Sequence, residues 1–163
     1  MSLANQSSIA GVDMKRKLPI VGLVIVMVFV AGYAESLCVK AEQANVRTGP
    51  GTGYKIAWEV YRYMPFAKVG VSLSGSWFAA KDVDGDINWI HRGLVTDRFN
   101  CAVVKKKRVN MRNGPGTHYA ASPFGPAGQY QSFRVLQRKG QWVEVKDGVN
   151  NIGWIHRDFL WIQ

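Results

Sequence analysis

The chain lacks the short motifs that mark common enzyme classes. It contains no Gly-x-Ser-x-Gly, no phosphate-binding glycine loop and no HExxH. Its 163 residues include only two cysteines, and neither accompanies a histidine motif of the kind that a thiol nucleophile needs. We therefore expect a protein that is not an enzyme and that needs no cofactor.

Residues that could bind a metal are also scarce. His91 and His156 occupy equivalent positions in repeated segments, but no Cys, Asp or Glu follows either at ligand spacing. The acidic group Asp82, Asp84 and Asp86 lacks the length and the final Glu of a calcium-binding loop. We predict no metal site, with the histidines stabilising turns and the aspartates at a solvated hairpin tip.

Beyond residue 34 the chain has no convincing helical pattern of ten residues. Short stretches alternate between apolar and polar residues, and glycine, proline and aspartate interrupt them. These stretches predict strands near residues 44–47, 56–61, 67–71, 77–81 and 88–91, and again near 133–137, 141–146 and 153–156. The fold class is therefore all-β.

The chain instead has a long internal repeat. The segment NVRTGPGTGY at 45–54 returns as NMRNGPGTHY at 110–119, and WIHR at 89–92 returns at 154–157. Both pairs lie 65 residues apart, a period that fits a small self-sufficient domain rather than a solenoid unit. In the middle, residues 67–69 match 133–135 best at an offset of 66.

These repeated residues resemble the bacterial SH3-like domain. The resemblance rests on Asn-hydrophobic-Arg-x-Gly-Pro-Gly-Thr, a later Gly-x-Trp and a closing Trp-Ile-His, which all occur twice. It implies two tandem, small SH3-like β-barrels of five to six strands, at residues 35–98 and 99–163, with a binding role towards cell-wall peptidoglycan or a protein partner. The second copy departs from the pattern at 122–128, where prolines and glycines predict a short strand or an irregular loop.

Residues 1–34 are interpreted as a leader and signal peptide. Lys15 to Lys17 precede an apolar stretch over 18–34 that ends in Gly32-Tyr33-Ala34, a small-residue cleavage site. The alternative is an uncleaved anchor, so the barrels would follow an N-terminal signal or anchor helix. The expected location is periplasmic or secreted, or alternatively anchored in the membrane and facing the periplasm.

Export decides how Cys38 and Cys101 are interpreted. In an oxidising compartment two cysteines favour a disulfide, here one that closes a loop of about 60 residues around the first copy. Two unpaired, buried thiols remain the alternative.

The tryptophans of the repeated strands are predicted to fill the barrel cores, because each small domain must bury something large. They are Trp77, Trp89, Trp142 and Trp154. The alternative is a platform for stacking a ligand.

Candidate ligand-binding residues follow the Gly-Pro-Gly turn. Tyr54, Trp58 and Tyr61 could form an aromatic groove in the first copy, where binding is expected mainly to reside, while Tyr119 is the only counterpart in the second. Packing of these rings against the other copy is the alternative.

The repeated arginines, Arg47 and Arg112, could grip a carboxylate or phosphate. They could equally hold the loop that follows by binding its carbonyl groups.

Charge completes the prediction. The chain has 21 basic and 11 acidic residues, and residues 105–108 form a basic run. Such a charge favours anionic envelope polymers, although lysines also protect an edge strand. We expect a non-catalytic module that binds a cell-envelope ligand, with peptidoglycan or an envelope protein as partner, no nucleic acid, and membrane contact only through residues 1–34 if they are retained. The alternatives are an accessory targeting subunit of a cell-wall hydrolase and a membrane-tethered scaffold.

Overall fold

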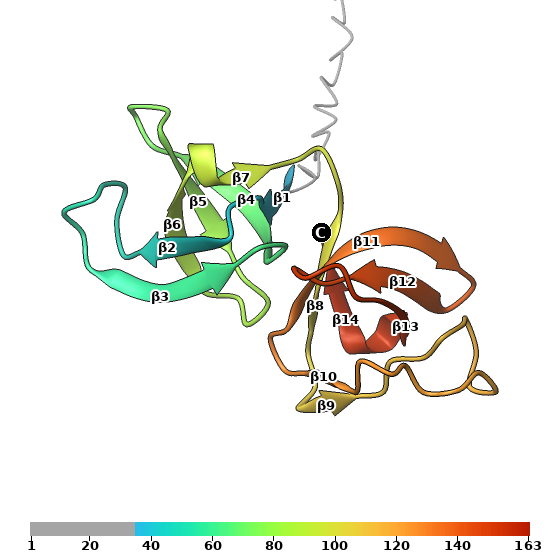
Figure 1. Ribbon diagram of the computed structural model, residues 1–163. Helices are drawn as coiled ribbons and strands as arrows, with labels where there is room; N and C mark the ends of the chain where they lie inside the picture. Colours follow the sequence, from blue (N-terminus) through green and yellow to red (C-terminus); the bar gives the residue numbers. More distant parts are fainter. Residues whose placement is uncertain (1–34) are drawn as a thin grey trace, which may run out of the picture. The chain divides into compact units, whose positions relative to one another are not determined.

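The computed structural model describes residues 35–163 (Figure 1). The signal or anchor helix predicted for residues 1–34 lies outside the described residues. Within 35–163, no helix has the length and hydropathy required to cross a bilayer. The described part consists of strands and two short 3-10 helices, which confirms the all-β class.

The first copy forms one antiparallel sheet with the strand order β3-β2-β6-β5-β4-β1-β7. Its elements are β1 (Glu35–Val39), β2 (Gln43–Arg47), β3 (Ile56–Tyr61), β4 (Pro65–Val71), β5 (Trp77–Lys81), β6 (Ile87–His91), the 3-10 helix η1 (Arg92–Leu94) and β7 (Val95–Thr96). The first strand pairs with both β4 and β7, so that the beginning and the end of the copy lie side by side (Figure 1).

The second copy repeats this pairing. Its main sheet has the order β13-β12-β11-β8-β14, and β9 and β10 form a separate pair. The elements are β8 (Cys101–Val104), β9 (Arg108–Val109), β10 (Ala127–Gly128), β11 (Ser132–Lys139), β12 (Trp142–Lys146), β13 (Ile152–His156), the 3-10 helix η2 (Arg157–Phe159) and β14 (Leu160–Ile162). As β1 does in the first copy, β8 pairs with both the hairpin strand β11 and the last strand β14.

Each core is built around a phenylalanine. The two phenylalanines show that the predicted alignment of the copies in this region is shifted by one residue. Phe66 pairs with Leu37, and Phe133 pairs with Ala102; both rings are 0% exposed. These two rings are 67 residues apart, so the match of 67–69 with 133–135 at an offset of 66 is wrong by one residue. Register is decided by which side chains face the core, because a one-residue slip turns every side chain to the other face.

The Pro/Gly segment of the second copy shortens the strand that corresponds to β3. Only Ala127 and Gly128 pair there, as β10, whereas β3 has six residues. Ser122 is buried at the start of a turn that closes at Gly125, whose φ of +77° suits glycine. Proline cannot donate to the ladder, so a longer strand is excluded here.

The structure buries two of the four repeated tryptophans and leaves the other two partly exposed. Trp77 and Trp154 are each 8% exposed, while Trp89 and Trp142 keep intermediate exposure. Next to Trp89, Ile90 is fully buried in the core, so the two-residue alternation of a strand turns Trp89 to the opposite face. The prediction that all four fill the cores therefore needs correction, because none of the four belongs to a core cluster, although Trp77 and Trp154 are buried.

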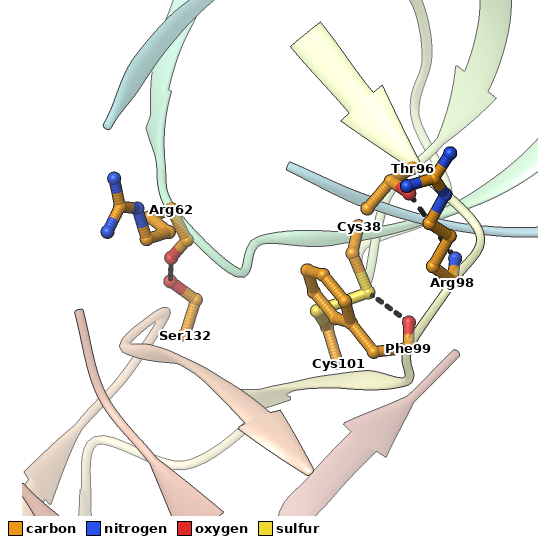
Figure 2. Close-up of a disulfide and its surroundings, with 7 residues drawn as sticks. All are labelled: Cys38, Arg62, Thr96, Arg98, Phe99, Cys101 and Ser132. Carbon is orange, nitrogen blue, oxygen red and sulfur yellow. Dashed lines mark hydrogen bonds between the residues drawn. A yellow bond between two sulfur atoms is a disulfide. The ribbon is translucent and has the colours of Figure 1, made fainter. Parts of the chain in front are cut away.

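A disulfide joins Cys38 to Cys101, as predicted (Figure 2). The structure differs in what the bond connects, because Cys38 lies in β1 and Cys101 lies in β8, the first strands of the two copies. The bond therefore links one copy to the other instead of closing the first copy alone. Both cysteines are fully buried, with Tyr63 and Phe99 packed around them.

Further contacts accompany this bond. The Ser132 hydroxyl donates a hydrogen bond of 2.8 Å to the backbone carbonyl of Arg62 (Figure 2). Val103 of β8 belongs to the core cluster of the first copy, and Trp161 of β14 packs against the same cluster. The first strand of the second copy thus contributes to both cores.

Candidate functional site

Each copy has a surface hollow in the same place, lined by residues from both ends of the repeat. The first hollow, of about 550 Å³, is lined by Gln43, Ala44, Asn45, Arg47, Thr52, Glu59, Trp77, His91 and Leu94. The second hollow, of about 520 Å³, is lined by Arg108, Val109, Asn110, Arg112, Thr117, Trp142, His156, Asp158 and Phe159.

Eight of the nine lining positions in the first hollow have their counterpart 65 residues later in the second. The pairs that keep the same residue are Asn45 and Asn110, Arg47 and Arg112, Thr52 and Thr117, Trp77 and Trp142, and His91 and His156. They come from β2 and the residues just after β9, from the Gly-Pro-Gly loop, from β5 and β12, and from the ends of β6 and β13. The repeated sequence motifs therefore meet at one place in each copy.

The repeated arginines hold the loop that carries the Gly-Pro-Gly turn. The Arg47 guanidinium donates a 2.7 Å hydrogen bond to the carbonyl of Tyr54, and Arg112 makes the same 2.7 Å bond to Tyr119. The tyrosine rings lie directly over Gly49 and Gly114, where a Cβ would overlap the ring. Glycine is required there by close approach, and the arginines position one wall of each hollow.

We expect Arg47→Ala to lower the free energy of unfolding by about 1 kcal/mol, because a side chain to carbonyl hydrogen bond is lost while water can replace part of it. Thermal unfolding of the variant checks this. Arg98→Ala, which removes another exposed arginine of the same copy, is the control. Equal melting temperatures for Arg47→Ala and wild type would show that the loop does not depend on the arginine.

An indole and an imidazole meet edge to face at the floor of each hollow. The ring centroids of Trp77 and His91 are 5.3 Å apart at 82°, and those of Trp142 and His156 are 5.4 Å apart at 90°. His91 Nδ1 accepts a 3.2 Å hydrogen bond from the Gly93 amide, which makes Nε2 the protonated nitrogen of the neutral ring. The histidines thus cap the 3-10 helices η1 and η2, in agreement with the turn-stabilising interpretation.

The two hollows differ in their charged groups. Glu59 of β3 lines the first, and the second has no carboxylate at this position because β10 is too short. In the second, Asp158 Oδ2 lies 3.5 Å from His156 Nδ1, and Arg108 replaces Gln43. The first hollow has one arginine and one carboxylate in its lining, while the second has two arginines and one carboxylate.

The aromatic residues predicted as one groove lie in two places. Tyr54 is 51% exposed and packs on its own turn, as does Tyr119 at 39%. Trp58 and Tyr61, both in β3, line a different cleft next to the second copy. The structure thus brings Arg47 and Arg112 to the hollows and leaves the four aromatic residues outside them.

Sequence reasoning did not group Asn45, Thr52, Trp77 and His91 into one site. The available signal was that both ends of the motif recur with one common offset, although the middle of the repeat does not. Side chains that are separated by more than 30 residues and keep such spacing are candidates for a shared site.

The aspartates of the β5–β6 turn have a structural role. Asp82 Oδ1 accepts hydrogen bonds from the amides of Asp84 and Asp86, at 3.0 and 2.9 Å. Asp147 does the same in the second copy, towards Val149 and Asn151. Burial raises the pKa of Asp82, and these two backbone hydrogen bonds oppose the rise. Within residues 35–163, no group of three or more His, Cys, Asp and Glu side chains could hold a metal ion.

The comparison with protein families decides the family. The model of the bacterial SH3 domain matches residues 40–97 and 105–161, which together make up more than half of the chain. The chain belongs to this family. The match also confirms the tandem arrangement, one domain in each copy.

A curated relative is the "Putative N-acetylmuramoyl-L-alanine amidase YrvJ" of Bacillus subtilis (strain 168). It is 25% identical over 135 residues, which cover 75% of this chain and 24% of the relative. The chain thus spans about a quarter of the length of the curated relative that it matches.

Solved structures with related architecture include an NlpC/P60 family protein from Bacillus cereus ATCC 10987 and the endolysin LysPBC5 CBD. The first is 9% identical, with a TM-score of 0.35 and coverage of 78% of this chain and 56% of that chain. The second is 15% identical, with a TM-score of 0.32 and coverage of 78% and 93%.

Proposed function

We propose that this protein is a non-catalytic module that binds the peptidoglycan of the cell envelope through its two matched hollows. The single observation that carries the proposal is that five residue types line both hollows at a constant offset of 65. A polymer with a repeating unit offers the same chemical group many times, and two like sites on one chain suit such a ligand.

The chemistry of the hollows supports a polar ligand with apolar parts. Each hollow offers an indole, an imidazole N–H, an asparagine amide and a threonine hydroxyl within about 500 Å³, which is the size of a small-molecule site. Family membership and the name of the amidase relative, whose printed activity concerns N-acetylmuramoyl-L-alanine, point to the same polymer.

Bivalent attachment explains why two weak sites are sufficient. Once one hollow is occupied, the second binds at a high local concentration of ligand, which raises the overall affinity by about 10²- to 10⁴-fold. The net positive charge adds attraction to an anionic wall, and this attraction weakens as salt is added.

Filling the hollows should abolish sedimentation with purified peptidoglycan. Thr52 and Thr117 are exposed loop residues at equivalent positions, so Thr52→Trp and Thr117→Trp can occupy the hollows without disturbing a core. Each single variant should bind about 100-fold more weakly than wild type, because the avidity is lost. The double variant, with both hollows filled, should not sediment with the polymer.

Leu73→Trp is the matched control, since Leu73 is fully exposed at a hairpin tip and lines neither hollow. Undiminished sedimentation of the double variant would contradict the proposal.

Salt separates the charge contribution from the shaped site. Replacing Lys105, Lys106 and Lys107 by Gln should weaken binding at low salt and have little effect at high salt, because exposed charges mainly accelerate encounter. The double threonine variant should be defective at both salt concentrations. Binding that disappears entirely in the lysine variant at high salt would assign recognition to the basic run.

An accessory subunit that targets a separate wall hydrolase would behave in the same way in sedimentation. Co-purification distinguishes the two functions, because only the accessory subunit should bring a hydrolase activity with it from envelope extracts.

A further inference from the structure

Residues of both copies line a cleft of about 750 Å³. We call it the inter-copy cleft. Its lining consists of Ala57, Trp58, Glu59, Tyr61, Met64, Asp82, Val83, Asp84, Asp86, Gly128, Gln129, Tyr130 and Gln131. It shares Glu59 with the first hollow but contains none of the tryptophans and histidines of the two hollows, so its aromatic and acidic groups form a second site.

Three aromatic rings form the apolar part of this cleft. Trp58 and Tyr61 come from β3, and Tyr130 comes from the loop between β10 and β11. Tyr61 is 59% exposed and Tyr130 is 45% exposed. Trp58 packs one side against Phe66 of the core, with centroids 6.0 Å apart, and so has a fixed orientation. Exposed, preorganised rings of this kind provide faces for a cation.

The charge of the cleft is opposite to that of the chain. Glu59, Asp82, Asp84 and Asp86 line it, which is four of the eleven acidic residues, and its lining includes no lysine or arginine. The chain as a whole carries a formal net charge of +10. Carboxylates gathered beside aromatic faces complement a positively charged group and disfavour an anion.

Tyr130 connects the acidic and aromatic parts. The nearby carboxylate of Asp84, which belongs to the other copy, raises the pKa of Tyr130. The equivalent residue of the first copy, Tyr63, shares the left-handed backbone but is buried beside the disulfide. Only the second copy presents this tyrosine to a ligand.

We propose that the inter-copy cleft binds a lysine- or arginine-bearing peptide segment of a partner protein, with the cationic side chain between the rings of Trp58, Tyr61 and Tyr130 and facing Asp84. The apolar rings take the aliphatic part of the side chain, and the carboxylates take its charge. This function is distinct from attachment to the wall polymer. It would let the module hold a protein while the hollows hold the envelope.

Titration of the full-length chain with the trilysine peptide tests the proposal, with trialanine and triglutamate as controls. The readout is the indole N–H signal of Trp58 in a ¹⁵N spectrum, assigned by its loss in Trp58→Phe. Trilysine should shift this signal with saturation, and the two control peptides should not. Because the rest of the surface repels a cationic peptide, saturation identifies local binding.

Two variants test the geometry. Asp84→Asn and Tyr130→Ala should each weaken trilysine binding by about two- to fivefold, as expected for one lost exposed ion pair or one lost exposed cation–π face. Asp97→Asn, an exposed carboxylate that lines no part of the cleft, should leave the affinity unchanged. The proposal would be overturned if all three variants bound trilysine with the affinity of wild type, or if wild type bound triglutamate as tightly as trilysine.

The test is independent of wall binding. Thr52→Trp with Thr117→Trp should bind trilysine as wild type does, and Asp84→Asn should sediment with peptidoglycan as wild type does. Self-association is the remaining occupant: a dimer in analytical ultracentrifugation that trilysine dissociates would assign the cleft to a second copy of this chain and overturn the partner-peptide proposal.

Discussion

Removing the Cys38–Cys101 bond should lower the free energy of unfolding by about 4 kcal/mol. In the chain-entropy model, the bond restricts an unfolded chain across a sequence separation of 63, and the stabilisation grows with the logarithm of that length. A loss of this size is a large part of the stability of a small protein. Urea unfolding of the Cys38→Ala/Cys101→Ala double variant, followed by tryptophan fluorescence, measures it.

The effect should reach both domains, because the bond joins β1 to β8 and Val103 of β8 packs in the first core. Wild type reduced with dithiothreitol is the matched control and should unfold at a similarly lowered midpoint. Two thiols that react with maleimide in the unreduced, denatured protein would contradict the bond. A variant in which only the first domain loses stability would contradict its role as a link.

Trp154→Ala should destabilise the second domain by about 3 to 5 kcal/mol, the usual cost of removing a buried aromatic side chain. Trp154 is 8% exposed, its backbone pairs with that of Arg112, and it precedes the core residue Ile155 in β13. The unfolding midpoint in urea should therefore fall far below that of wild type.

Trp89→Ala provides the comparison at the equivalent position of the first domain. Trp89 is partly exposed, so less apolar area returns to water on truncation and the cost should be smaller. If both variants lost the same free energy of unfolding, the expectation that Trp89 contributes less to stability than Trp154 would be wrong. A stable Trp154→Ala protein that no longer binds peptidoglycan would make Trp154 a ligand platform.

Much of the architecture could be predicted from the sequence because both copies have the same turn residues at equivalent positions. Glycine and proline at 49–51 and 114–116 exclude a helix, and alternating apolar residues between turns indicate strands. The family followed from the duplicated motifs, and the disulfide was favoured because the predicted signal peptide implies an oxidising compartment. The register of β4 and β11 did not follow from the sequence, because Phe133 lies 14 residues after Tyr119 whereas Phe66 lies 12 after Tyr54, and the turn after β11 is shorter than the turn after β4.

The site was predicted less completely. Arg47 and Arg112 were singled out, and the structure shows them bonded to Tyr54 and Tyr119, so they shape the hollows through the loops. Trp58 and Tyr61 were singled out as well, but their neighbour in the cleft is Tyr130 of the other copy. A contact between residues about 70 positions apart leaves no periodic trace in a single sequence.

The sequence by itself determined that this is a tandem pair of small β domains with a net positive charge, and it favoured a disulfide. Turn residues, strand alternation and duplicated motifs are local properties, and they act within a few residues. The tertiary structure decided which tryptophans are buried, which strands the disulfide joins, and which side chains meet in the two hollows and the inter-copy cleft. These features depend on sheet register and on the packing of distant strands, where a shift of one residue exchanges the buried face for the exposed one.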